Sequence, residues 1–242
     1  MTKRGRGAAF FDADGTLMRT HIGMYYLHIA TRGMSPIQRA LWIAAAAPRA
    51  LGYLVLDQVN RGRFNRVFYR NYRHLTPAEA KGQAEAILNE VIEPRLFPAA
   101  LERIAEHHEH GEPVVIVSGS LDFLVAPLAR RLGAAAALTA VLAEENGRFT
   151  GELQGAPVSG PEKARLARAW ARDRVIDLEA STAYGDSTAD LDLLRLVGHP
   201  VAVNPSPKLR KIAREAGWPI ERWRVADRAL ASGGPRVSAA GA

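Results

Sequence analysis

Four short polar stretches could carry chemistry, and three of them follow apolar runs that are typical of buried strands. The groups are Asp12 and Asp14 in FFDADGTL, Ser118 and Gly119 in VVIVSGS, Lys163 in GPEKARL, and Asp186 and Asp190 in YGDSTAD. Because the carboxyl ends of parallel strands meet at one edge of a sheet, we expect these side chains to converge there.

The carboxylates predict a site for a hard cation. Carboxylates placed this close repel one another unless a cation, a shared proton or water compensates. Oxygens from Asp12, Asp14 and Asp186 suit Mg²⁺, which prefers octahedral oxygen ligands at about 2.0–2.1 Å. Asp14 lies where the strand gives way to a loop, so it could offer its backbone carbonyl and keep its carboxyl free.

The remaining groups suit a phosphoryl group. The Ser118 hydroxyl, the Gly119 N–H and the following helix N-terminus can bind an anion, and Lys163 adds a positive charge. The chain has no cysteine, and no serine stands beside an obvious histidine partner, so we expect a carboxylate nucleophile. One aspartate would attack phosphorus, and the other would protonate the leaving oxygen and then activate water.

Strands and helices that would position these groups alternate along the chain. Apolar runs predict strands at 8–12, 113–117, 181–184 and 200–203, and helical patterns lie at about 97–110, 121–132, 161–172, 188–196 and 206–216. This alternation predicts an α/β fold with a parallel sheet covered on both faces. Two β-prone runs around Glu-Asn-Gly predict a hairpin over 138–153.

The stretch from 18 to 95 breaks this alternation, because it contains helical patterns and no convincing strand. We expect a core formed by residues 1–17 and 96–228, a helical insertion over 18–95 above the carboxyl ends of the strands, and a disordered tail at 229–242.

Positive charge is concentrated in the insertion. The 242-residue chain has a formal net charge of +7, and the stretch from Arg19 to His74 holds nine arginines and one acid, Asp57. This stretch either faces an anionic partner or forms a solvated basic face. The absence of cysteine and of a secretory signal predicts a cytoplasmic location.

Residues 41–56, LWIAAAAPRALGYLVL, are apolar on nearly all sides. The run is shorter than the roughly 20 residues of a membrane span, and Pro48-Arg49 interrupts it. We expect a buried hairpin or the interface of a homodimer formed through the insertion. Because arginines adjoin the run, peripheral contact with an anionic membrane or a lipid-like substrate is the alternative.

Together these motifs resemble the haloacid dehalogenase superfamily of phosphatases. The DxDGT motif matches residues 12–16, and the later motifs match Ser118, Lys163 and residues 185–190 in the same order. The resemblance implies a Rossmann-like core, a Mg²⁺ cofactor held by Asp12, Asp14 and Asp186, and a helical cap. It also implies that Asp12 is the nucleophile, that Asp14 is the general acid and base, and that Asp190 belongs to the outer metal shell or orients Lys163.

The insertion after the first motif resembles the cap of the phosphoserine-phosphatase-like branch, subfamily IB. Gly15 stands where that branch typically has serine, and His21 stands where it has the glutamate that holds the substrate amine. Arg66 falls where a cap arginine binds the substrate carboxylate. The resemblance therefore implies a retained anion contact at Arg66 and a lost amine contact at His21.

We therefore expect a Mg²⁺-dependent phosphomonoester hydrolase that acts through an aspartyl-phosphate on a small phosphorylated metabolite with its own acidic group. Hydrolysis of a lysophospholipid or phospholipid head group, and of phosphoserine, are the alternatives. A non-catalytic protein that binds anions or nucleic acid is a remote alternative, and no nucleic-acid partner is expected.

Overall fold

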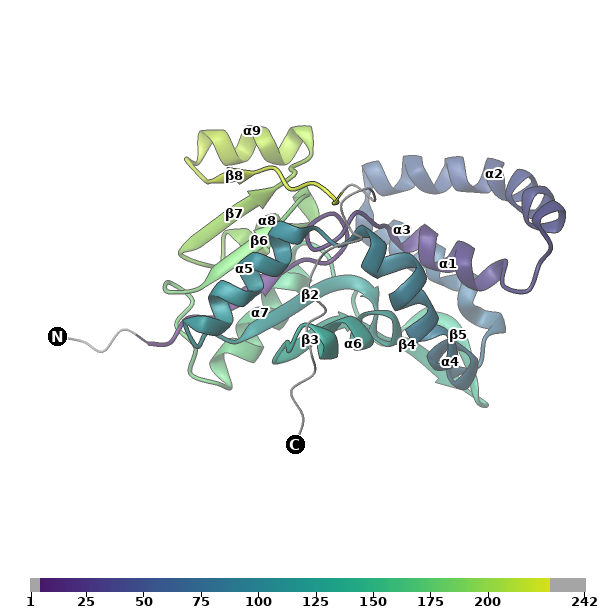
Figure 1. The fold of residues 1–242 in the computed structure, drawn as a ribbon, viewed down its shortest axis with the longest axis horizontal. Coiled ribbons are helices and arrows are strands. Elements are labelled where there is room, and N and C mark those ends of the chain that lie inside the picture. The colour runs from purple at the N-terminus through teal and green to yellow at the C-terminus, as the bar shows by residue number, and fades with distance from the viewer. Residues whose placement is uncertain (1–4, 227–242) are drawn as a thin grey trace.

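A computed structural model describes residues 5–226 and places a six-stranded parallel sheet at the centre of the molecule (Figure 1). The strand order is β3-β2-β1-β6-β7-β8. The strands are Ala9–Phe11 (β1), Val114–Leu121 (β2), Ala136–Ala140 (β3), Thr182–Gly185 (β6), His199–Val203 (β7) and Ile220–Glu221 (β8). The chain moves to one side of β1 through β2 and β3 and to the other side through β6, which is the kind of switch point where open α/β sheets bind ligands.

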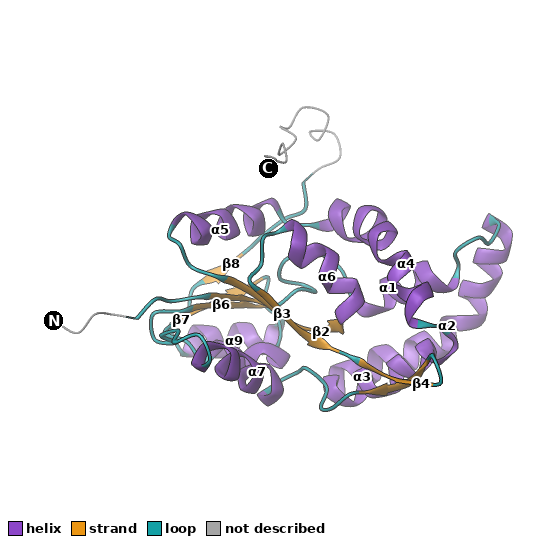
Figure 2. Ribbon diagram, turned by 90° about the horizontal axis from the view of Figure 1, so that it is seen from below, coloured by secondary structure: helices purple, strands orange, loops and turns teal. Residues whose placement is uncertain are grey.

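Helices cover both faces of this sheet (Figure 2). Helices α5 (Pro98–Glu109) and α6 (Asp122–Arg131) lie on one face, and α7 (Pro161–Arg172) and α9 (Pro207–Glu215) lie on the other. The short elements η4 (Thr188–Asp190) and α8 (Leu191–Leu194) connect β6 to β7. The α/β class predicted from the alternating pattern is confirmed.

The central strand shows why its sequence is continuously apolar. Phe10 packs edge-on against Trp170 on α7, and Phe11 stacks on Tyr184 of the neighbouring strand β6 at 4.3 Å between ring centroids. A strand covered on both faces has no solvated side, so its sequence has no polar alternation.

The predicted hairpin over 138–153 is wrong at its first strand. Ala136–Ala140 pairs in parallel with β2 as an edge strand, and the hairpin consists of β4 (Leu142–Glu145) and β5 (Arg148–Leu153). The apolar run LTAVL carries no turn residue that would mark the break between β3 and β4. The hairpin packs on the helical insertion, where the Phe149 N–H donates to the Leu75 carbonyl.

The insertion is helical, as predicted, and no strand occurs between residues 22 and 95. Its elements are α1 (Ile22–Ala30), α2 (Pro36–Val59), α3 (Arg61–Tyr69), η1 (Arg70–His74), α4 (Pro77–Ile87), η2 (Leu88–Ile92) and η3 (Glu93–Arg95). Met18 and Leu96 pair in an antiparallel bridge where the insertion leaves and rejoins the core. The exact boundaries at 17 and 96 remain a proposal, and the expected tail at 229–242 lies outside the described residues.

The expectation of a buried hairpin over 41–56 is wrong. These residues belong to the single helix α2, which runs through Pro48 and begins with a capping box between Ser35 and Gln38. None of its described side chains is buried, and Pro36–Asp57 has the length and the mean hydropathy, 1.2, of a helix that could cross a membrane. The alanines on both sides of Pro48 favour the helix strongly enough to accommodate the lost hydrogen bond.

Candidate active site

Asp12 and Asp14 lie where β1 ends and the chain turns toward the insertion. The Asp12 N–H donates to the Tyr184 carbonyl at 3.0 Å, which extends the pairing of β1 with β6. Gly15 has a φ of +95°, and a Cβ at this position would collide with the Asp186 carboxylate. Glycine is therefore the residue that lets the loop pass close to Asp186.

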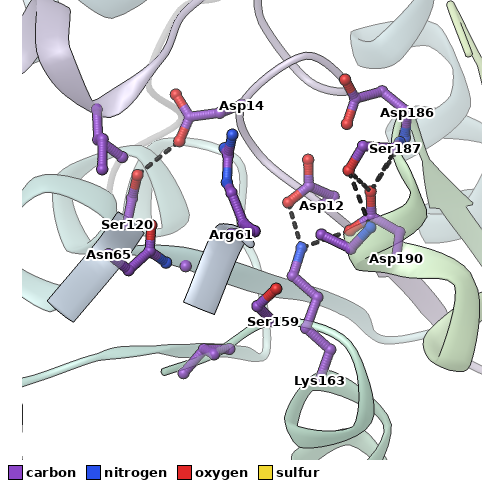
Figure 3. A pocket seen from close by; sticks show the side chains of 14 residues that line it. Asp12, Asp14, Arg61, Asn65, Ser120, Ser159, Lys163, Asp186, Ser187 and Asp190 are labelled. Atoms are coloured by element: carbon purple, nitrogen blue, oxygen red, sulfur yellow. Dashed lines mark hydrogen bonds and ion pairs between the residues drawn. The ribbon is translucent and has the colours of Figure 1, made fainter. Parts of the chain in front are cut away.

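Lys163 of α7 joins two buried aspartates (Figure 3). Its Nζ donates to Asp12 Oδ1 at 2.5 Å and to Asp190 Oδ1 at 2.6 Å. The second oxygen of Asp190 accepts from the Ser187 N–H, the Ser187 hydroxyl and the Asp186 N–H. Burying charges costs several kcal/mol per ion unless they are paired and hydrogen-bonded, as they are here.

The carboxylates of this cluster titrate differently. Burial raises the pKa of Asp12 to about 7, although Lys163 opposes the shift. Burial, together with the charges of Asp190 and Asp12, raises the pKa of Asp186 well above its ordinary value. Burial also disfavours the charged form of Asp190, but Lys163 and the Ser187 N–H outweigh it and lower its pKa. Asp12 and Asp186 therefore lack sufficient positive charge around them.

The donor set fits a divalent cation. Asp12, Asp186 and Asp190 each place one carboxylate oxygen within 4.8 Å of the other two. Four carboxylates and two cationic side chains line the pocket, which leaves two negative charges in excess. Because both oxygens of Asp190 already accept hydrogen bonds, Asp12 and Asp186 are the carboxylates available to a hard metal ion such as Mg²⁺.

Because of this excess of negative charge, we expect the stability of the metal-free protein to depend on pH. The folded pKa of Asp12 is raised from 3.8 to about 7, so the metal-free protein should lose stability as pH rises through that range. Because Mg²⁺ binds the deprotonated carboxylates, it should raise the melting temperature more at pH 8 than at pH 5.5. Thermal melts in EDTA and in MgCl₂, with KCl at matched ionic strength as control, test this; an equal shift at both pH values would contradict it.

Three hydroxyl groups hold the Asp14 carboxylate apart from that cluster. Thr20 Oγ1 and the Tyr25 hydroxyl each donate to Oδ1 at 2.7 Å, and Ser120 Oγ donates to Oδ2 at 2.5 Å. Figure 3 shows Asp14 turned toward Ser120, while Asp12 faces Lys163. Burial and the Asp14 charge raise the pKa of Tyr25 well above its ordinary value, so this phenol remains a donor.

Tyr25→Phe should therefore lower kcat about tenfold with little change in KM, because Asp14 loses one donor that orients it and stabilises its charge. Tyr72→Phe is a matched control, since the buried Tyr72 hydroxyl has no hydrogen-bond partner in the described part of the chain. Equal losses in the two variants would show that Tyr25 acts only through packing.

A small pocket lies between the core and the insertion. The insertion contributes Ile22, Arg61 and Asn65 to its lining. A single nitrogen of Arg61, Nη1, donates to both carboxylate oxygens of Asp57 at 2.7 Å. Asn65 is buried, and its Oδ1 has no hydrogen-bond partner within residues 5–226, so it can accept from a bound ligand.

The structure brings most of the predicted site residues together. Those that line the pocket are Asp12, Asp14, Gly119, Lys163, Asp186 and Asp190. Ser118 is outside the lining, because it is buried and its hydroxyl accepts from the Ser120 N–H. Arg66 and His21 are exposed and also lie outside it.

Sequence reasoning missed Arg61, Asn65 and Ser120 in the pocket, and Tyr25 and Thr20 behind Asp14. The spacing of Arg61 and Asn65, four residues apart on one helix face, was an available signal. Ser120 follows directly in the same SGS stretch as Ser118. No local pattern distinguishes Tyr25 or Thr20 from ordinary packing residues.

Comparison with known proteins supports this geometry. A family model described as haloacid dehalogenase-like hydrolase matches residues 9–195. Phosphoserine phosphatase SerB1 of Mycobacterium tuberculosis is 34% identical over 97% of this chain and 77% of its own length. Histidinol-phosphatase of Neisseria meningitidis is 28% identical over 89% of this chain and 98% of its own length.

A solved structure described as a phospho-aspartyl intermediate analogue of phosphoserine phosphatase has the same fold. Its TM-score is 0.68 at 20% sequence identity, with 94% of this chain and 98% of the other covered. The chain belongs to the haloacid dehalogenase-like hydrolases, and it is an enzyme of that family.

Proposed function

We propose that the protein is a Mg²⁺-dependent phosphomonoester hydrolase that acts through an aspartyl-phosphate on Asp12. The observation that carries this proposal is the division of labour between two aspartates. Asp12 is paired with Lys163 beside the candidate metal ligands, and Asp14 is held separately by three hydroxyls. One carboxylate is thus placed for attack and the other for proton transfer.

In the first half-reaction, Lys163 and the Gly119 N–H would bind the phosphoryl oxygens, and Mg²⁺ would supply further positive charge there. Asp12 Oδ2, which has no hydrogen-bond partner among the described residues, would attack phosphorus. The bond from phosphorus to the leaving oxygen breaks, and Asp14 gives that oxygen a proton. In the second half, Asp14 takes a proton from water, which attacks phosphorus and releases phosphate from Asp12.

The pocket residues that the insertion supplies determine which chemical groups of a substrate can bind there. Among the described residues that line the pocket, the insertion supplies a cation and an amide but no carboxylate. An ammonium group would therefore find no acidic partner on that side, which disfavours phosphoserine. Arg61 favours a second anionic group, and the unpartnered Asn65 Oδ1 favours a hydroxyl or N–H donor. We propose a small phosphorylated metabolite that carries an acidic group, with Arg61 in the role expected of Arg66.

Substitution of Arg61 tests this assignment. Arg61→Gln should raise KM about tenfold for a phosphomonoester with a second acidic group and leave KM for a neutral one nearly unchanged, because only the first uses the guanidinium. Arg63→Gln removes an exposed charge from the same helix and is the matched control. A uniform rise in KM for all esters would contradict the assignment.

To test the substrate class, phosphate release is measured in the presence of Mg²⁺ for a panel of phosphomonoesters. The panel contains phosphoserine, histidinol phosphate, sugar phosphates, glycerol 3-phosphate and lysophosphatidate. Preference for a small ester with an acidic group, lost in Asp12→Asn, is the expected result. Preference for lysophosphatidate would favour the lipid alternative. No release from any ester would contradict the proposal.

A further inference from the structure

Helix α2 exposes an apolar side that no described part of the chain covers. The largest exposed fractions are 78% for Val59, 74% for Ile37 and 66% for Leu41. Figures 1 and 2 show α2 running along the outer edge of the insertion. Soluble proteins rarely leave a contiguous apolar surface of this kind without a partner.

The exposed residues form one side of the helix. Ile37, Leu41, Leu51, Val55 and Val59 recur at the spacing of a single helical stripe, and Ile43 and Leu54 lie on its flank. The opposite side holds α2 on the insertion. Trp42 contacts Tyr26 of α1, and Tyr53 contacts Phe64 and Phe68 of α3.

Positive charge is concentrated on α2 and on the segments next to it in the chain. Arg39 and Arg49 are on α2, and Arg32, Arg63 and Arg66 are on the segments before and after it. All five side chains are exposed, and within residues 5–226 none of them makes an ion pair or side-chain hydrogen bond. The only acid of α2, Asp57, is already paired with Arg61.

We propose that α2 docks on the surface of a bilayer that contains anionic phospholipid, with its apolar side in the boundary between head groups and acyl chains. A helix with one apolar side, and with arginines on its other sides and in the adjoining segments, has the composition of a helix that lies in this interface. Each basic residue near an anionic surface adds electrostatic attraction, which salt weakens by screening.

A second copy of the chain fits this surface less well. Pairing two α2 helices would bring two arginine-rich insertions together, and like charges across an interface oppose association. A membrane span also fits poorly. Contacts at Trp42 and Tyr53 fix both halves of α2 to the insertion, and a span would break them.

Docking would place the active site near the membrane. The end of α2 leads directly into α3, where Arg61 lines the pocket. The proposed docking depends on the outer side of α2 and not on the catalytic aspartates, so it stands apart from the proposed function. Asp12→Asn should bind vesicles like the unmodified protein.

The test is vesicle flotation at about 50 mM salt. One set of vesicles is phosphatidylcholine alone, and the other is phosphatidylcholine with 30% phosphatidylglycerol, a composition chosen for the assay. We expect flotation with the anionic vesicles only, and a loss of at least tenfold in the bound fraction for Leu41→Glu combined with Leu51→Glu. Val175→Glu is the matched control, because Val175 is an exposed apolar residue on the core. Circular dichroism melts check that each variant is folded.

Arg39→Gln combined with Arg49→Gln should also reduce flotation, as should 500 mM salt. Absence of flotation at low salt, or equal flotation with neutral vesicles, would overturn the proposal.

Light scattering tests whether a second copy of the chain covers the apolar side of α2 instead. A dimer that the paired glutamate substitutions convert to a monomer, without vesicle binding by the unmodified protein, would assign the face to a second copy.

Discussion

Asp12→Asn should reduce phosphate release by about 10⁴-fold or more while the protein remains folded. An amide nitrogen or oxygen cannot replace the carboxylate that attacks phosphorus, so the covalent route is lost. Stability should be preserved, because burial raises the pKa of Asp12 to about 7 and the site already disfavours its charge. Phosphate release and a thermal melt at pH 8 measure the two effects.

The control for this prediction is Asp173→Asn. Asp173 follows α7 and is exposed, so it shares the change of charge but not the site. Turnover by Asp12→Asn within tenfold of the unmodified enzyme would exclude Asp12 as the nucleophile.

Lys163→Met should lose both activity and stability. The substitution leaves Asp12 and Asp190 buried without their cation, and breaking a buried pair in this way costs about 3–5 kcal/mol. It also removes a positive charge that would bind the phosphoryl group. The loss of stability should be smaller at pH 5 than at pH 8, because Asp12 can then be protonated within the fold.

Urea unfolding at both pH values, together with phosphate release, measures this outcome. Arg165→Met is the matched control on the same helix, since Arg165 is exposed and, among the described residues, forms its ion pair with Glu162 alone. If Arg165→Met lost more activity than Lys163→Met, the third motif would be assigned to the wrong residue.

The core of the site could be predicted from sequence because it depends on local features. Asp12, Asp14 and Asp186 follow short apolar strands, and parallel strands bring such ends together whatever the details of packing. Lys163 follows from its place at the start of a helix that packs beside them. The same reasoning predicted the α/β class.

The residues of β2 and α3 that line the pocket could not be predicted in this way. Strand β2 continues to Leu121, beyond the predicted end at 117, and its pairing with β3 becomes irregular between Ser118 and Leu121. Both serines are buried there, but Ser118 Oγ accepts from the Ser120 N–H, whereas Ser120 Oγ donates to Asp14. Likewise, the rotation of α3 about its axis is set by packing, and it places Arg61 and Asn65 in the pocket rather than Arg66.

The environment of helix α2 also could not be predicted from the sequence. Its composition indicates an apolar helix, but composition does not say which neighbour covers it. The expectation of burial failed because the insertion builds its aromatic core from α1, α3 and η1, and α2 contributes only Trp42, Tyr53 and Leu56 to the packing. The break between β3 and β4 was hidden for a similar reason, because only the pairing of β3 with β2 defines it.

The most direct test of the central claim is to trap the phosphorylated enzyme. The protein is mixed with a ³²P-labelled ester that it cleaves, quenched in acid within the first turnover, and mapped by proteolysis. We predict label on the peptide that contains Asp12 and none in Asp12→Asn. Rapid phosphate release without labelled protein, or label on another residue, would contradict covalent catalysis by Asp12.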